Sequence, residues 1–114
     1  MPIIDVKLNS PLSQYKENAL KTKLGEAIVT FPGKSEYWLM INFSDNCHLW
    51  FRGYNNFPIA MVEIKLFGGA DEETCSHMTK LVCDIFQEEL NVSPDHVYVK
   101  YEFCDRWGWN GENF

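Results

Sequence analysis

The chain has 114 residues, a formal net charge of −6 and an apolar fraction of 46%. This length predicts one domain over residues 1–114, and the apolar fraction is typical of a packed globular core. Scattered Lys and Arg disfavour nucleic acid as a partner, no segment approaches the roughly 20 apolar residues of a membrane span, and no classical signal peptide begins the chain. We therefore expect a cytoplasmic protein, with secretion by another route left open.

The first half of the chain predicts a strand, a helix and two further strands. Residues 3–8 alternate loosely, which is typical of a strand. We expect Ser10 to cap the following helix and Pro11 to occupy its first turn, with Pro32-Gly33 ending it. The apolar residues of this helix recur at spacings of three and four: Leu12, Tyr15, Ala19, Leu20, Leu24, Ala27, Ile28 and Phe31. Residues 37–43 then predict a buried strand, and residues 49–51 a short one.

The second half of the chain repeats this order. Residues 59–66 predict a strand, and Asp71 begins a helix whose first turn holds Glu72 and Glu73, where the helix dipole favours anions. Its apolar stripe is Cys75, Met78, Leu81, Val82, Ile85, Phe86 and Leu90. Residues 97–103 form a clear strand. We therefore expect a duplicated β-α-β fold of the α+β class, with a four-stranded sheet, short edge strands and both helices on one face.

The cysteines and histidines indicate no metal site and no cofactor. Cys47, Cys75, Cys83 and Cys104 form no C-x-x-C pair, and the three histidines are isolated from one another. Cys75 falls on the apolar face of the second helix and Cys83 near its edge. We expect both to be buried free thiols.

The Met1-Pro2 start supports a catalytic hypothesis. An initiator methionine is usually removed before a small residue, and its removal would leave Pro2 as a free secondary amine. An α-amino group titrates at roughly 7.7–8.0 in water. Burial or a nearby cation lowers that pKa toward the range in which a general base works best. Taken alone the pattern is weak, because many proteins start Met-Pro for no catalytic reason.

Further short motifs follow in order along nearly the full length of the chain. They are Gly33-Lys34 after the first helix, Phe67-Gly68-Gly69-Ala70 before the second, Val92-Ser93-Pro94-Asp95-His96-Val97-Tyr98-Val99 at the last long strand, and Gly108-Trp109-Asn110-Gly111 with Phe114 at the end. Each motif is weak alone, but jointly they are quite specific. With Met1-Pro2, they make the chain resemble the macrophage migration inhibitory factor family of the tautomerase superfamily.

The resemblance implies a homotrimer of tautomerase-type folds with an active site at each subunit interface. It implies cofactor-free keto–enol tautomerisation of small, aromatic α-keto acids such as phenylpyruvate, with Pro2 as the catalytic base. The substrate-binding residues implied are Lys34, the backbone N–H of Ile64, Tyr98 donated by the neighbouring subunit, and the aromatic wall of Trp109 and Phe114.

Several positions depart from the family pattern. Trp38 stands where the family has a pocket tyrosine, and Lys100 where it has an asparagine. Trp107 fits the aromatic wall by position only. The C-x-x-C tied to thiol-oxidoreductase activity in mammalian members is replaced by Pro58-Ile59-Ala60-Met61. We therefore count Trp38, Lys100 and Trp107 among the substrate-binding candidates, with consequences for substrate preference.

Structural interpretations compete with these roles. Lys34 follows a helix terminus, where a cation suits the dipole; Tyr98 lies in a strand, where Tyr is common; and Trp107 and Trp109 could simply pack. Three functions stay open: a tautomerase, a secreted cytokine-like protein that binds a receptor of a host or of its own organism, and a binding domain of ferredoxin type. A trimer with Pro2 at a subunit boundary would separate the third from the other two.

Overall fold

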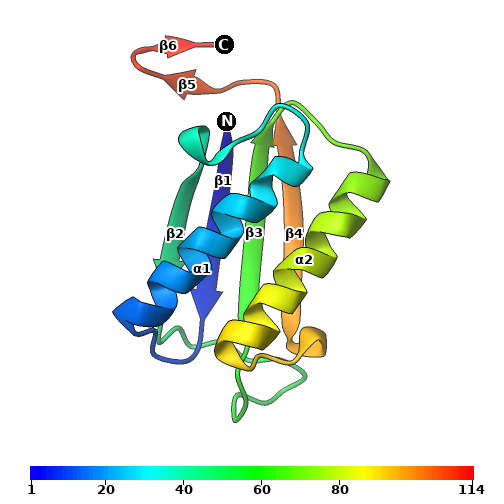
Figure 1. Cartoon of the computed structure of the whole chain (residues 1–114). Coiled ribbons are helices and arrows are strands. Elements are labelled where there is room, and N and C mark those ends of the chain that lie inside the picture. The colour runs from blue at the N-terminus through cyan, green and yellow to red at the C-terminus, as the bar shows by residue number, and fades with distance from the viewer.

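The computed structural model, which describes residues 1–114, shows a four-stranded sheet, two helices and a separate C-terminal hairpin (Figure 1). The strands of the main sheet are β1 (Pro2–Leu8), β2 (Met40–Ser44), β3 (Ala60–Phe67) and β4 (Val97–Cys104). The helices are α1 (Gln14–Ala27) and α2 (Glu72–Leu90), with short 3₁₀ turns η1 (Ile28–Thr30), η2 (Glu36–Trp38) and η3 (Pro94–His96). The hairpin is β5 (Gly108–Trp109) with β6 (Glu112–Asn113).

The sheet confirms the predicted β-α-β duplication. Its strand order is β2-β1-β3-β4, with β1 parallel to β2, β3 parallel to β4, and β1 antiparallel to β3. Each helix therefore connects two neighbouring parallel strands. A ferredoxin-type fold places another strand between the two strands that each helix connects. The ferredoxin-type alternative is therefore wrong.

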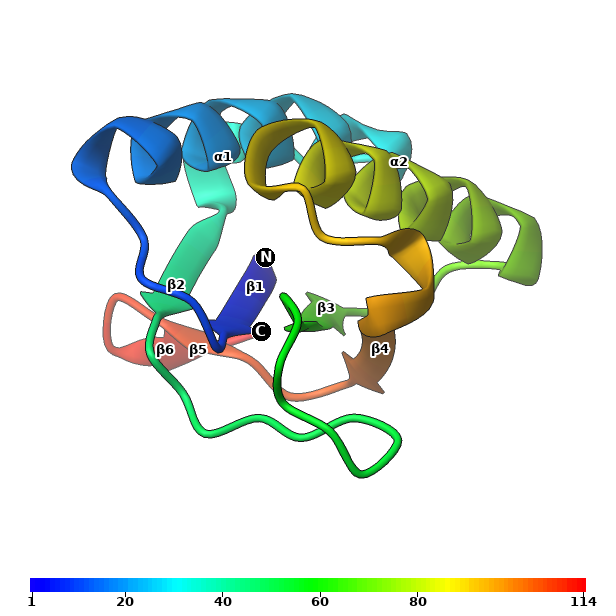
Figure 2. The ribbon, with the colours of Figure 1, turned by 90° about the horizontal axis from the view of Figure 1, so that it is seen from below.

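Both helices pack on one face of the sheet, as predicted (Figure 2). Side chains alternate between the faces of a strand, and β1 and β3 each bury every second residue on the helix side. Ile4, Val6 and Ile64 are fully buried there, against Leu24 of α1 and Phe86 of α2. No helix of the chain is both long enough and apolar enough to cross a membrane.

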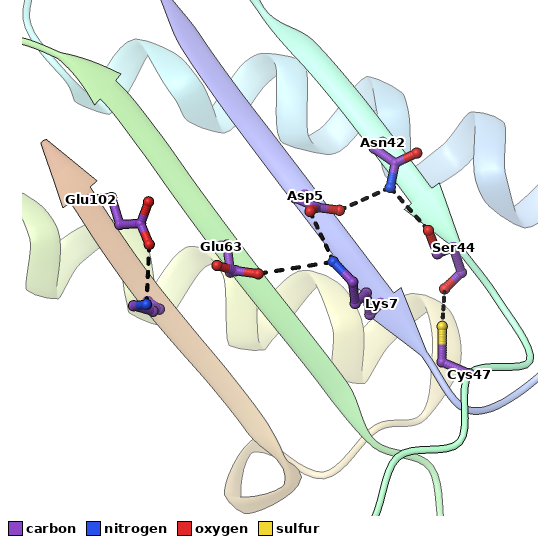
Figure 3. A network of polar contacts seen from close by, with 8 residues as sticks. Asp5, Lys7, Asn42, Ser44, Cys47, Glu63 and Glu102 are labelled. Carbon is purple, nitrogen blue, oxygen red and sulfur yellow. Dashed lines mark hydrogen bonds and ion pairs between the residues drawn. The ribbon is translucent and has the colours of Figure 1, made fainter. Parts of the chain in front are cut away.

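The other face of the sheet carries a polar network (Figure 3). Lys7 lies 2.9 Å from Asp5 and 3.9 Å from Glu63, measured from Nζ to a carboxylate oxygen. The side-chain amide of Asn42 donates to Asp5 at 2.9 Å. The hydrogen bond from Asn42 and the ammonium of Lys7 hold the pKa of the Asp5 carboxyl below its ordinary value. Charged groups on this face therefore satisfy one another across β1, β2 and β3.

The first helix begins later than predicted. Its cap is Ser13, whose hydroxyl accepts from the N–H of Lys16 at 3.2 Å, and not Ser10. The carboxylate of Asp45 accepts from the N–H of Leu12 at 2.8 Å, so the residues before Ser13 are held by the loop after β2 instead of by a helical turn. Tyr15 is 78% exposed and does not belong to the buried stripe.

Of the predicted strands, the one over residues 37–43 begins later than expected and the one over residues 49–51 is wrong. Tyr37 and Trp38 lie in η2, and β2 begins only at Met40, at the edge of the sheet, where its side chains are half-buried or exposed. Residues 49–51 form no strand: Phe51 makes a single bridge to Tyr54 around a tight turn. The short strands of the structure are β5 and β6, which pair only with each other in a sheet of their own and extend neither edge of the main sheet.

The second helix follows the prediction closely. Asp71 is its cap and accepts from the N–H of Thr74 at 2.8 Å. Cys75 and Cys83 are free thiols, as expected, but only half-buried. Partial desolvation raises the pKa of both thiols.

Candidate active site

A cavity of about 780 Å³ lies where the N-terminus, η2 and the C-terminal hairpin meet. Figure 1 shows these three segments gathered at one end of the sheet. Pro2 contributes to the lining, together with a largely aromatic wall: Tyr37, Trp38, Phe103, Trp107 and Trp109. Three charged side chains also line the cavity: Lys65, Glu102 and Arg106.

Pro2 is held at this cavity by the central position of its strand. β1 lies between β2 and β3, and Pro2 pairs in register with Leu66. Proline lacks an N–H and is tolerated as the first residue of a strand, where it removes no bond from the middle of the ladder. Pro2 is buried and therefore fixed in place beside the cavity.

Phe67 and Lys34 surround the first residue of the chain. The backbone N–H of Phe67 donates to the carbonyl oxygen of Met1 at 3.1 Å. The Nζ of Lys34 donates to the carbonyl oxygen of Phe67 at 2.9 Å. Partial burial lowers the pKa of the Met1 α-amine, and the Lys34 ammonium lowers it further. This end of the cavity therefore favours a neutral amine.

The turn before Lys34 explains how its ammonium reaches the site. Gly33 has φ +78°, a left-handed conformation that glycine adopts without steric cost. The turn closes when the N–H of Lys34 donates to the carbonyl of Phe31 at 3.0 Å. Because Phe31 is buried in the core, the backbone of Lys34 is held in a fixed position.

Aromatic contacts hold the C-terminal segment against the cavity. Trp38 packs edge to face on Trp109, with ring centroids 4.9 Å apart. Phe114 packs on Phe67 at 5.9 Å, and its N–H donates to the carbonyl of Trp107 at 2.9 Å. Phe114 therefore supports the wall without itself lining the cavity, whereas Trp38, Trp107 and Trp109 line it.

Ile64 does not line the cavity. Its side chain is fully buried beneath the helices, and its backbone lies between β1 and β4, where the sheet encloses its N–H. The backbone N–H at the site is that of Phe67, the last residue of β3. The sequence signal was present, because Phe67 begins the Phe67-Gly68-Gly69-Ala70 motif.

Tyr98 and Lys100 lie elsewhere on β4 and do not line this cavity. Tyr98 is 65% exposed, and its ring packs on Phe51 at 5.3 Å. Lys100 forms an ion pair with Glu102 at 3.1 Å. Their expected contribution to a neighbouring subunit's site stays a prediction.

The charged lining residues Lys65, Glu102 and Arg106 were missed from the sequence. Strand alternation places Lys65 on the face opposite Ile64, but periodicity cannot say that this face borders the N-terminus. Arg106 reaches the cavity because the chain turns back over the sheet after β4.

Comparisons with known proteins cover the whole chain. The family model described as Macrophage migration inhibitory factor (MIF) matches residues 1–114. The chain is 27% identical to Macrophage migration inhibitory factor of Mus musculus, covering 100% of this chain and 99% of that protein. It is 29% identical to Macrophage migration inhibitory factor of Meriones unguiculatus, with the same coverage. The crystal structure of Leishmania major MIF2 superposes with a TM-score of 0.91 at 27% identity, covering 100% of this chain and 97% of that one.

Proposed function

Because the chain belongs to the macrophage migration inhibitory factor family, we propose that it is a cofactor-free keto–enol tautomerase of small α-keto acids, with Pro2 as its general base. The observation that carries the proposal is the arrangement of Lys34 and Phe67 around the N-terminal amine, at the edge of a cavity lined by Pro2. Tautomerisation needs a base, a donor for the enolate oxygen, and return of the proton to another atom.

Removal of Met1 is the first requirement. While Met1 is attached, the Pro2 nitrogen is an amide and has no basic lone pair. After removal, Pro2 is a secondary amine in the environment that already lowers the pKa of the Met1 amine. A neutral Pro2 would take a proton from the carbon next to the substrate carbonyl and return it to the enolate oxygen, or run the same steps in reverse.

The Met1 carbonyl also indicates where a substrate oxygen would bind. It accepts from the Phe67 N–H at 3.1 Å, so its removal frees a backbone donor beside the Pro2 nitrogen. A carboxylate or enolate oxygen of the substrate would replace it. The bond from Lys34 to the Phe67 carbonyl involves the next peptide group, and it holds the backbone of Phe67 in place beside the Pro2 nitrogen. Lys34 adds a positive charge where negative charge develops.

The cavity suits a substrate with a hydrophobic body. Its volume of about 780 Å³ falls within the range of roughly 300–1,000 Å³ typical of small-molecule sites. Trp38, Trp107 and Trp109 present faces and edges on which an aromatic ring would stack while water is excluded. Phenylpyruvate has this combination of a ring and an α-keto acid.

We further propose a homotrimer. Strands β2 and β4 are open edges of the sheet, and open edges are usually covered. At the β4 edge, Tyr98 is exposed and packs on half-buried Phe51. A neighbouring subunit would bury this pair, and Tyr98 and Lys100 would then line the cavity of that subunit. Sedimentation at micromolar concentration should give three times the 13.3 kDa chain mass. A monomer would remove Tyr98 and Lys100 from the proposed site.

A signalling role is the second candidate, and the names of the mouse and gerbil relatives favour it. Such a role would not need turnover. The assay that decides between the two follows the conversion of enol to keto phenylpyruvate by protein whose intact mass shows that Met1 is absent. Turnover that falls in Pro2→Gly supports the tautomerase. Equal rates with and without the protein would contradict it.

A further inference from the structure

Most basic side chains of this protein already have an acidic partner. Of the ten Lys and Arg residues, six form ion pairs: Lys7, Lys16, Lys23, Arg52, Lys80 and Lys100. Lys21, Lys34, Lys65 and Arg106 form none. Two of these four, Lys65 and Arg106, line one cavity, and Lys34 lies near the Met1 amine at its edge, although the chain has 16 acidic residues to pair with them.

The carboxylates nearest Lys65 are satisfied by other donors. Glu102 lies opposite Lys65 on β4 but pairs with Lys100 at 3.1 Å. Asp5 accepts from Asn42 at 2.9 Å and from Lys7 at 2.9 Å. Figure 3 shows Glu102 and the contacts of Asp5 on the sheet face away from the helices. The Lys65 ammonium attracts both carboxylates electrostatically but forms no ion pair with either, so it can still contact a ligand directly.

Two separate segments bring the unpaired charges to the cavity. Lys65 lies on β3 opposite Ile3, one register position from Pro2. Arg106 lies in the connection between β4 and β5, close in sequence to Trp107. Between them the wall is largely aromatic, so an anion bound there would be partly shielded from water, where charge-assisted hydrogen bonds are strong.

We propose that Lys65 and Arg106 select an α-keto acid whose hydrophobic body carries a second carboxylate. This inference rests on the proposed function and names its substrate class. Lys34 and the Phe67 N–H hold the reacting end beside Pro2, and Lys65 with Arg106 hold the distant carboxylate. Glu102 also lines the cavity, but Lys100 offsets its charge.

The experiment compares two enols that differ in charge but hardly in shape: 4-carboxyphenylenolpyruvate and 4-carbamoylphenylenolpyruvate. Wild-type protein should favour the carboxylate by about tenfold in kcat/KM, the size of one charge-assisted contact. The preference should shrink at high salt, because ions screen partly exposed charges. Equal kcat/KM for the two enols would overturn the proposal.

Variants assign the preference to the two cations. The ratio of the two kcat/KM values should fall to near one in Lys65→Met with Arg106→Gln, and rise in Glu102→Gln. The matched control is Lys21→Met, which removes an unpaired lysine on α1 and should keep the wild-type ratio. A ratio that survives in the double variant would overturn the assignment.

Binding distinguishes a failure of this inference from a failure of the proposed function. If neither enol is converted, the tautomerase proposal fails. Calorimetry with 4-carboxycinnamate and 4-carbamoylcinnamate then tests the cations without any turnover. About tenfold tighter binding of the dianion, lost in the double variant, would still support selection by Lys65 and Arg106. Equal binding would contradict it.

Discussion

The indole of Trp38 packs edge to face on the indole of Trp109, with centroids 4.9 Å apart and planes at 87°. Tyr37 also packs edge to face on Trp38, with centroids 4.9 Å apart and planes at 82°. These contacts join η2 to β5, and the three rings line the cavity that Pro2 also lines. Such aromatic pairs contribute about 0.5–1.5 kcal/mol in addition to the free energy gained by burying their apolar surface.

Trp109→Ala should therefore raise KM for phenylpyruvate by roughly two- to tenfold, which is the same energy expressed as affinity. Thermal stability should change little, because Trp109 is half exposed and outside the main core. The matched control is Trp50→Ala, which removes an exposed indole away from this cavity. Equal effects of the two substitutions on KM would contradict the role of the wall.

Glu36 lies across the face of Gly25 on α1. A Cβ at residue 25 would lie 2.6 Å from the Glu36 Cδ and closer still to Oε2, so Gly25→Ala must displace this side chain. Alanine also favours the helix by about 0.5–1 kcal/mol over glycine. We expect Gly25→Ala to be stabilising in a Glu36→Ala background and less so, or destabilising, in wild type. Denaturation of the four proteins measures this coupling, and additive effects would contradict the contact.

Stability should depend on pH through Asp5. Its folded pKa is lowered by the hydrogen bond from Asn42 and by Lys7, so the unfolded chain binds the proton more readily. The stabilisation is therefore present above the unfolded value of about 3.9 and is lost as pH falls through the folded pKa. Asp5→Asn should be less stable than wild type at pH 7, with the gap closing at acid pH.

Denaturant unfolding at both pH values checks the Asp5 prediction. The control is Asp105→Asn, because no hydrogen bond or ion pair involves the Asp105 side chain. The difference in unfolding free energy between Asp105→Asn and wild type should be the same at pH 7 and at acid pH. A pH-independent difference between wild type and Asp5→Asn would mean that the network on this face does not stabilise the fold.

Periodicity was sufficient for the elements that bury a regular face. The alternation along β3 and the stripe on α2 are local patterns, and the cap at Asp71 depends only on its own helix. Ser10 and Ser13 are equally good caps by residue type. The choice between them depends on Asp45, which meets Leu12 only in the folded chain.

The site was harder to predict because its parts meet through long-range contacts. Tyr37 and Trp38 have strand-forming side chains, but the contact with Trp109 accompanies a 3₁₀ turn instead. The expected role of the Ile64 backbone stays a prediction, because alternation assigns a face but not the residue that ends level with Met1. That residue is Phe67.

The pH dependence of catalysis tests the environment of the amine. Burial and the Lys34 cation lower the pKa of the N-terminal amine, and we expect the same for the Pro2 amine that processing frees. kcat/KM should rise with pH through one ionisation below about 8. Lys34→Ala should move this ionisation upward, because a like charge no longer disfavours protonation. An unshifted profile, matching that of Lys21→Ala, would contradict the assignment.

The most direct test of Pro2 as the base blocks the nitrogen of that residue. One alanine inserted between Met1 and Pro2 leaves every side chain in place after processing, but converts the Pro2 amine into an amide. The measurement is kcat/KM for phenylenolpyruvate with this protein and with the processed natural chain, each verified by intact mass. The account predicts a loss of at least about 10²-fold, the lower limit for general base catalysis. Equal turnover by the two proteins would contradict it.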